Sequence, residues 1–534
     1  MSDPITELLP DPNAPPSSPA DDLTGRDRMA WNVIASWAGQ MVFVAAGFVM
    51  PRFMDRHIGQ AALGVWDFGW SLVSYLSLAQ GGIGSSVNRF VARHRAQGDQ
   101  VGVNRAVASV MCVQVAATAI VLLLTCLATW LVPSLLSGQL QEQVGDARWV
   151  VFLLGMSLAV QMAFDSYRGV ITGCHRWDLH NGINALFYAV TVIAMICLLV
   201  SGGGLRSQAT AYLVGVVATE ITRAVIAYRV CPGLSVSLSH ARRQQALEML
   251  VFGSKTLAGS LSRLLLYQTN SLIIMAVLGP GPLAVYSRSR SLVSHAQTFI
   301  NKFGFVLTPM AGSLQAADRR SELRGLLVTS SRLATYLSLP IVLVLAIMGD
   351  PILHIWMGPR YQLGWVLAIL AIGHLTEMTR QPVMGILAGL NAHGRLAVVG
   401  LAAALCSAVL GFFAVGVFRW GLIGAAVSIA LPLALVNGIY VPLYACRRVG
   451  MPLRQYLAEI NRGPLLCAVP FGAVLLLGRV CCADNAYRAL LYGAGSAMLI
   501  LSLLYWRYVV PPRVRGMAVR TLRRTFGRVI LERA

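Results

Sequence analysis

Charged residues are scarce in this chain, and their scarcity narrows the class of protein that it can be. Only 12% of the 534 residues are charged, 56% are hydrophobic, and the mean hydropathy is +0.65. Soluble domains carry about 25% charged residues, so this composition argues against a soluble protein. It predicts an all-α integral membrane protein that crosses the bilayer many times.

Acidic residues are fewer still, because 22 acids stand against 43 basic residues and leave a net charge of +21. A nucleic-acid-binding module would gather its basic residues, with aromatic residues between them, on a soluble surface. Here the basic residues lie in the loops between apolar segments. We therefore expect no nucleic-acid partner, and we interpret the charge as a signal of membrane topology.

Motifs for catalysis and for cofactor binding are missing as well. The sequence contains no GxxxxGK[ST] phosphate loop, no HExxH, no DxD, and no paired carboxylates in a large outer loop. Its 10 cysteines include no CxxC pair, so neither a zinc site nor a redox motif is indicated. We expect a protein that is not an enzyme and that uses no metal or cofactor.

Apolar segments of spanning length fill most of the chain. About fourteen occur, at roughly 30–50, 62–84, 106–132, 149–172, 182–201, 208–229, 250–278, 282–308, 327–349, 363–389, 396–417, 421–446, 463–480 and 487–508. Residues 1–28 are rich in Pro, Asp and Ser and lack the apolar core of a signal peptide, which predicts a disordered tail. Residues 511–534 form a basic tail. If the helices alternate from an inside start, about 30 of the 43 basic residues fall inside, so both termini are expected in the cytoplasm.

An internal repeat divides the apolar region. The pattern at Ile58-Gly59, Leu63–Trp66 and Ser71–Tyr75 returns 220 residues later, at Leu278-Gly279, Leu283–Tyr286 and Ser291–His295. The polar turn at 95–100 then aligns with 315–320. Six helices separate the copies, so both copies run in the same direction. We predict an N-terminal lobe at 29–247 (helices 1–6), a C-terminal lobe at 248–447 (helices 7–12), and two extra helices at 448–510, with a central cavity between pseudo-symmetric lobes.

The segment from Tyr286 to Lys302 is long enough to span a bilayer, but only one side of the helix would be apolar. On a helix its polar residues cover one half and its apolar residues the other. Because an arginine facing lipid costs about 2.5–3.5 kcal/mol, Arg288 and Arg290 indicate a helix that faces a water-filled cavity. The first repeat has Phe68 and Trp70 at these positions, so the repeated scaffold does not require cations there.

The preceding helix adds basic residues to the predicted cavity wall. Lys255 and Arg263 belong to segment 250–278, and Asp67 is the main candidate counter-charge in the second helix. Lys255 and Lys302 lie near the expected cytoplasmic ends, where reaching the interface explains them equally well. An excess of guanidinium groups at Arg263, Arg288 and Arg290 suggests an anionic ligand, since arginine binds phosphate bidentately.

Three acid–base pairs are spaced i, i+3 along predicted helices. They are Asp165 with Arg168, Glu220 with Arg223, and Glu377 with Arg380. We predict that each is a structural ion pair within its own helix. Glu377 is the best candidate for a transport role, because His374 lies one turn away and could join it in a proton relay. His295 is a second titratable candidate.

Residues in both halves of the repeat resemble those of a known transporter family. The first half has Pro51, Gly59, Leu63–Trp66, GGIG at 81–84, Arg89 and Gly98-Asp99, and the second has SLIIMAVLG at 271–279, Val285-Tyr286, Pro309 and Ala317-Asp318. From about residue 30 to 508, the chain resembles the flippases of O-antigen and exopolysaccharide lipid-linked oligosaccharides. Their superfamily also contains multidrug and toxic-compound exporters and the lipid II flippase.

The resemblance implies a two-lobed helical bundle in the bacterial inner membrane. It implies movement of an undecaprenyl-pyrophosphate-linked oligosaccharide to the outer leaflet, with Arg263, Arg288 and Arg290 holding the pyrophosphate. Membrane lipids and polysaccharide polymerase machinery are the implied partners. Many relatives carry an acid where this chain has Asn270, so ion coupling at that position is not implied.

Two other functions stay open at this point. A multidrug exporter of the same superfamily would share the fold, but its substrates are often cations, which an arginine-lined cavity repels. A membrane glycosyltransferase or polymerase would need catalytic acids and an outer loop that the sequence does not provide.

Overall fold

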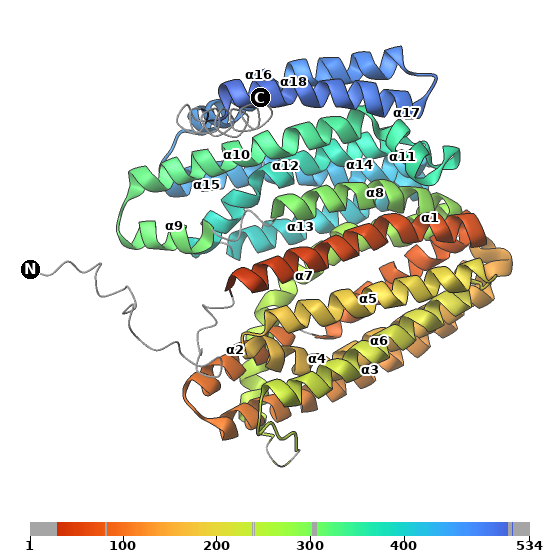
Figure 1. The fold of residues 1–534 in the computed structure, drawn as a ribbon, viewed down its shortest axis with the longest axis vertical. Coiled ribbons are helices and arrows are strands. Elements are labelled where there is room, and N and C mark those ends of the chain that lie inside the picture. The colour runs from red at the N-terminus through yellow and green to blue at the C-terminus, as the bar shows by residue number, and fades with distance from the viewer. Residues whose placement is uncertain are drawn as a thin grey trace, which may run out of the picture. The chain divides into compact units, whose positions relative to one another are not determined.

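A computed structural model describes residues 29–80, 83–237, 239, 241–301, 307–392, 394–510 and 515 of the 534. None of these residues belongs to a strand, and helices make up nearly all of the described chain (Figure 1). The expected all-α architecture is therefore confirmed. The expected tails at 1–28 and 511–534 lie outside the described residues, apart from Arg515.

The described residues group into two compact units, each of which is discontinuous in sequence. Unit 1 contains the chain up to Met50, residues 76–130 and residues 151–257. Unit 2 contains residues 51–75, 131–150 and the chain from Ala258 onward. Four helices therefore contain residues of both units.

Unit 1 is a helical bundle with a small apolar core. Val87, Val107, Val170 and Ile171 are each fully buried in that core. Small residues allow its helices to approach closely, as where Gly169 lies against the side chain of Val87. Its elements are the first part of α1 (Met29–Leu76), η3 (Ser77–Gln80), α2 (Ile83–Ala96), most of α3 (Gln100–Leu140) and α4 (Val144–Gly173), α5 (Trp177–Val200), α6 (Leu205–Val230), and the start of α7 (Arg243–Leu278).

Unit 2 is larger and has its main core around α10, α12, α15 and the start of α16. Leu327, Ile386, Tyr456 and Ile460 are fully buried there. A second core joins α16 and α18, which run side by side in Figure 1. Its complete helices are α8 (Pro280–Asn301), α9 (Leu307–Ala316), α10 (Arg320–Ile347), α11 (Gly349–Met357), α12 (Gly364–Gly389), α13 (Gly394–Gly411), α14 (Gly421–Leu435), α15 (Val441–Val449), α16 (Leu453–Cys481), α17 (Ala486–Arg488) and α18 (Gly495–Tyr508).

Short non-α segments extend several of these helices. π-helical turns follow α13, α14 and α17, at η7 (Phe412–Val417), η8 (Val436–Tyr440) and η9 (Ala489–Ala494). Two 3₁₀ turns, η4 (Gln141–Gln143) and η6 (Pro359–Tyr361), precede α4 and α12. Because most of these turns continue a helix, segments such as 394–417 and 421–449 each form one continuous apolar rod.

The backbone repeats at the spacing that the sequence predicts. Gly59, which interrupts α1, and Gly279, which separates α7 from α8, both have φ of 87°. Positive φ also recurs at Gly98 and Asp318, again 220 residues apart. The turn bonds match: the amide of Asp99 donates to His94 O at 2.9 Å, and that of Arg319 donates to Leu314 O at 3.0 Å.

The correspondence continues to the end of the second copy. The two copies then differ in length by a few residues. Positive φ recurs at corresponding places, at His175 and Asn391, at Gly202 and Arg419, and at Gly233 and Gly450. Arg419 thus adopts a conformation that glycine adopts most easily and that Gly202 adopts in the other copy, whereas His175 and Asn391 adopt it without glycine in either copy. Beyond Gly450, α16–α18 have no counterpart in the first copy, which agrees with two extra helices.

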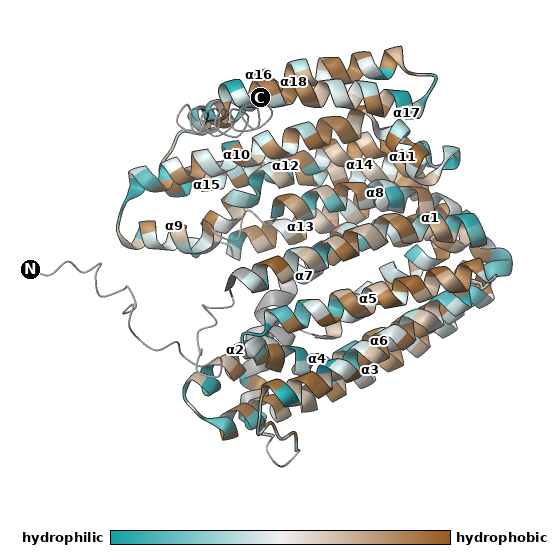
Figure 2. Ribbon diagram, viewed as in Figure 1, coloured by the Kyte–Doolittle hydropathy of each residue, from teal (hydrophilic) through white to brown (hydrophobic). Residues whose placement is uncertain are grey.

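Helices continue past the apolar segments into polar residues. The segment expected at 463–480 is a helix from Leu453 to Cys481, and that expected at 106–132 runs from Gln100 to Leu140. Hydropathy decreases at charged ends, but helical hydrogen bonds extend into the wet interface. Figure 2 shows this pattern, with apolar midsections and hydrophilic residues at many helix ends.

Ten described stretches are long and apolar enough to cross a membrane. Two of them, Ile34–Ala79 and Gln100–Gly173, have 46 and 74 residues, more than one crossing requires. The protein is therefore a multi-pass membrane protein, and fourteen crossings stays a prediction. The short helices α2, α9 and α11 were not predicted, because their 14, 10 and 9 residues are too few to give a spanning signal.

Candidate binding site

Helix α8 separates its residues into two faces, as its sequence predicts. Leu283, Tyr286 and Leu292 are buried in unit 2, and Ser294 is exposed. The helix ends at Asn301, and Lys302 lies outside the described residues. The polar half predicted from the sequence is therefore the less buried half, with the exception of Arg288.

Arg288 forms a buried ion pair with Asp67. Its Nη2 atom lies 2.6 Å from Oδ1 and 2.8 Å from Oδ2 of the carboxylate. The two side chains are 7% and 13% exposed, so little water screens the pair. The predicted counter-charge is thus confirmed, and the Arg288 charge is already neutralised in this structure. Nε of Arg288 has no hydrogen-bond partner among the described residues.

Arg290 lies against Tyr267 of α7. Nη1 of Arg290 donates to the carbonyl oxygen of Tyr267 at 2.8 Å, and its guanidinium carbon lies 5.8 Å from the centre of the phenol ring. A carbonyl and a ring face hold the guanidinium in place without cancelling its charge. Arg290 therefore keeps a net positive charge that a ligand can use.

Tyr267 links this arginine to the titratable residues of α12. Its hydroxyl donates to Oε2 of Glu377 at 2.9 Å. The ring of His374 stacks on the phenol with centroids 5.9 Å apart and planes at 21°. His374 is itself 2% exposed, with Nδ1 2.8 Å from the carbonyl oxygen of Leu370. Arg290, Tyr267, His374 and Glu377 therefore form one contiguous cluster, named here the Tyr267 cluster.

Arg263 is exposed, one helical turn before Tyr267. It makes no ion pair or hydrogen bond with any other described residue. The backbone of Lys255 is helical, but its side chain lies outside what the structure describes. His295 is half-buried on α8, with Nε2 3.3 Å from the hydroxyl of Ser291. Of the predicted cavity cations, Arg263 and Arg290 thus have no acid paired with them, whereas Arg288 has one.

Asn270 follows Tyr267 by three residues on α7 but has different partners. It is fully buried, its Nδ2 donates to Ser407 at 3.4 Å, and its Oδ1 accepts from Ser428 at 3.1 Å. These bonds join α7 to α13 and α14. A neutral amide at this position holds three helices together and does not contact the cations.

Two of the three predicted ion pairs are confirmed. Nε of Arg168 lies 2.7 Å from Oδ1 of Asp165, and Nη1 of Arg223 lies 2.5 Å from Oε1 of Glu220. The confirmed pairs both belong to unit 1, where they line one cavity.

The third predicted pair, Glu377 with Arg380, is wrong. Glu377 bonds to Tyr267 of α7, whereas Arg380 turns toward α16, with its guanidinium carbon 5.6 Å from the ring centre of Tyr456. Residues at i and i+3 can meet, but here each side chain has a partner on another helix. Arg380 is 6% exposed, and its Nε and Nη1 have no hydrogen-bond partner among the described residues.

Tyr267 is the site residue that the sequence analysis did not identify. The available signal was its spacing, because it lies four residues after Arg263 and therefore on the same helix face. A tyrosine in an apolar segment is ordinarily a core residue, so spacing alone did not distinguish it.

Comparison with known proteins identifies what this arrangement resembles. Residues 107–363 match the model of a family described as polysaccharide biosynthesis proteins. Over 514 residues the chain is 22% identical to EpsK of Bacillus subtilis (strain 168), described as an uncharacterized membrane protein. That match covers 94% of this chain and 99% of EpsK.

Two solved structures with a similar fold are described as a flippase and a transporter. The lipid II flippase MurJ, in an inward closed conformation, aligns with a TM-score of 0.67 and 13% identity, over 90% of this chain and 100% of MurJ. An inward-facing multidrug resistance transporter of the MATE family in the MOP superfamily aligns with a TM-score of 0.61 and 15% identity, over 78% of this chain and 99% of that one. At these identities the likeness concerns the fold alone.

Proposed function

We propose that this chain, a member of the polysaccharide transporter family of multi-pass membrane proteins, flips a polyprenyl-pyrophosphate-linked oligosaccharide repeat unit across the bacterial inner membrane. The product serves the biosynthesis of a surface polysaccharide. The protein acts as a non-enzymatic carrier by alternating access, with both termini in the cytoplasm. Membrane lipids and a polysaccharide polymerase are its proposed partners.

The observation that supports this function best is the unpaired positive charge on α7 and α8. Arg290 is held by the carbonyl oxygen and the ring face of Tyr267, and Arg263 is exposed one helical turn before Tyr267 on α7. A pyrophosphate carries closely spaced oxygens that two guanidinium forks can share. These two arginines make the first contacts with the substrate.

Arg288 binds the substrate after the pyrophosphate replaces Asp67 as its partner. Nη2 of Arg288 donates to both carboxylate oxygens of Asp67, and it would donate to phosphate oxygens in the same way. The incoming pyrophosphate competes with Asp67 for Arg288. Because Asp67 belongs to α1 and Arg288 to α8, the exchange couples substrate binding to a rearrangement of these helices.

The Tyr267 cluster is the proposed coupling element. Glu377 and His374 are titratable, and Tyr267 connects them to Arg290. Protonation of Glu377 weakens its hydrogen bond with the Tyr267 hydroxyl. The Tyr267 ring, against which Arg290 lies, is then held less firmly. Asn270 lies outside this cluster, so we propose no coupling role for it.

Deletion of the gene tests the proposed function. We expect loss of the surface polysaccharide and accumulation of lipid-linked repeat units, whose glycans react with a membrane-impermeant oxidant in inverted vesicles but not in spheroplasts. Wild-type protein and Arg320→Ala, a change in an exposed ion pair, restore export, whereas Arg290→Ala does not. Normal polysaccharide together with raised drug sensitivity would support a multidrug exporter instead.

A further inference from the structure

Unit 1 contains a cavity that the proposed pyrophosphate site does not use. Its volume is about 320 Å³, and its walls come from α1, α4, α5 and α6. This volume is at the lower end of the roughly 300–1,000 Å³ of small-molecule pockets. The lining residues that bear on its chemistry include Phe43, Asp165, His180, Tyr188, Glu220 and Arg223.

The charges in this cavity balance. Asp165 pairs with Arg168, and Glu220 accepts two bonds from Nη1 of Arg223 at 2.5 and 2.6 Å. Nη2 of Arg223 donates to Oδ1 of Asn184 at 2.6 Å. Two acids and two arginines thus neutralise each other within one cavity.

Several polar atoms on the cavity wall are nevertheless left without partners. Oδ2 of Asp165, Nε of Arg223 and Nδ1 of His180 are buried and make no hydrogen bond among the described residues. Asp165 and Arg223 are only 4% and 6% exposed as residues. An unsatisfied buried polar atom costs about 1–3 kcal/mol, and more if charged, so these atoms indicate a place for a hydrogen-bonding ligand or ordered water.

The arrangement disfavours charged ligands of either sign. Two guanidinium groups repel a metal ion or another cation, and no group of three or more potential metal ligands occurs among the described residues. Two carboxylates likewise repel a phosphate. A neutral ligand that both donates and accepts hydrogen bonds fits the unpartnered carboxylate oxygen and guanidinium nitrogen together.

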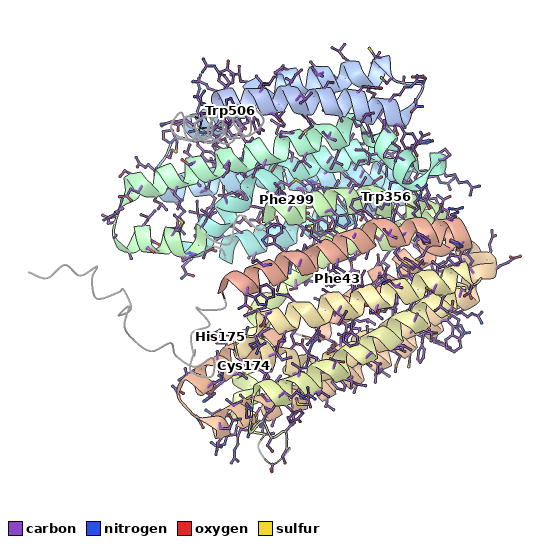
Figure 3. All side chains as sticks on the ribbon, viewed as in Figure 1. Phe43, Cys174, His175, Phe299, Trp356 and Trp506 are labelled. Carbon is purple, nitrogen blue, oxygen red and sulfur yellow. The ribbon has the colours of Figure 1, made fainter. Side chains whose placement is uncertain are left out.

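An aromatic surface completes the cavity. The rings of Phe43 and Tyr188 stack with centroids 4.4 Å apart, one from α1 and the other from α5. Phe43 is labelled on α1 in Figure 3. Flat rings beside planar carboxylate, guanidinium and amide groups suit a pyranose ring, which has an apolar face and a rim of hydroxyl groups.

We propose that this cavity binds one neutral sugar residue, with Asp165 accepting from a hydroxyl, Arg223 donating to another, and the ring of Tyr188 lying under the pyranose. The sugar belongs to the glycan of the lipid-linked substrate, and to that extent the inference rests on the proposed function. A free sugar would present the same chemistry, and the experiment distinguishes the two sources.

Binding of methyl glycosides to full-length protein in nanodiscs tests the site. The probes are methyl glycosides of glucose, galactose, mannose, rhamnose and N-acetylglucosamine, measured by saturation-transfer NMR, with inorganic pyrophosphate as a charged comparison. We expect at least one glycoside to bind, and Asp165→Asn and Tyr188→Leu each to weaken its binding at least tenfold. Asp484→Asn, a matched change in an exposed helical pair, leaves it unchanged. Elution volume and melting temperature report whether each variant is folded.

Two results would overturn the proposal: no glycoside binds wild-type protein that is active in export, or both folded variants bind as wild type does. Accumulation of lipid-linked repeat units in cells with Asp165→Asn identifies the substrate glycan as the ligand. Weakened glycoside binding without such accumulation identifies a free sugar. Because the glycosides carry no pyrophosphate, their binding to unit 1 is decided independently of whether the chain is a flippase.

Discussion

Nη2 of Arg288 on α8 and Oδ1 of Asp67 on α1 lie 2.6 Å apart in a pair that is almost fully shielded from solvent. The first repeat supplies the acid and the second supplies the base. The pair explains how a scaffold without cations at Phe68 and Trp70 tolerates an arginine at the corresponding position in its second copy.

Removing either member of this pair should destabilise the protein more than removing both. Arg288→Ala leaves a buried carboxylate alone, and Asp67→Asn leaves a buried guanidinium alone, each at a cost of about 3–5 kcal/mol. The double variant should lose less than the sum of the two. Thermal unfolding in detergent measures the coupling in a double-mutant cycle. Additive losses would mean that the pair contributes no interaction energy.

Tyr267→Phe should impair transport without unfolding the protein. The substitution removes the 2.9 Å bond to Glu377 but keeps the ring beneath Arg290 and next to His374. We expect slower export and an altered pH dependence in a vesicle flipping assay. Tyr505→Phe, which removes a hydroxyl bond to the Tyr336 carbonyl away from this cluster, serves as the control. Identical pH profiles in both variants would exclude a coupling role.

Gly64→Leu should prevent correct packing of unit 2. A Cβ at Gly64 would overlap the carbonyl oxygen of Pro280, at the start of α8. Backbone cannot yield as a flexible side chain can, so we expect little folded protein by fluorescence-detected size exclusion. Gly400→Ala in α13 meets nothing within 4 Å and should be neutral or stabilise by up to about 1 kcal/mol. Equal yields of both variants would contradict this packing.

Arg380→Met should not destabilise the protein. Arg380 is buried, two of its nitrogens have no hydrogen-bond partner among the described residues, and its guanidinium lies over the ring of Tyr456 without an acid paired to it there. Replacing a buried, poorly compensated charge by an apolar side chain of similar length is often neutral or stabilising. A melting temperature at or above that of wild type is expected in detergent. A fall of several degrees would show that Arg380 holds α12 and α16 together.

Most of the fold follows from the sequence, because the bilayer imposes a simple rule on it. Apolar runs must be helices there, and the 220-residue repeat correctly matched Gly59 with Gly279, which share a φ of 87°, and the turn at Gly98 with that at Asp318. Helix ends and the short helix α11 could not be located in this way, since neither depends on sustained hydropathy.

The site was harder to predict from the sequence than the fold, because its interacting side chains come from segments far apart in the chain. Asp67 was found as the acid for Arg288 since acids are so few. Pairing by helical spacing identified the partners of Arg168 and Arg223 but failed for Arg380, whose surroundings are set by α16. Only the structure shows that Tyr267 joins Arg290 to Glu377, or that both pairs of unit 1 line one cavity.

Binding of a lipid pyrophosphate tests the central claim most directly. Full-length protein in nanodiscs is titrated with undecaprenyl pyrophosphate and, in parallel, with undecaprenol, which lacks the charged group. We predict at least tenfold preference for the pyrophosphate in the wild type and in Arg320→Ala, and loss of that preference in Arg263→Ala and Arg290→Ala. Equal binding of the two lipids by the wild type, or an undiminished preference in both variants, would contradict the assignment of these arginines.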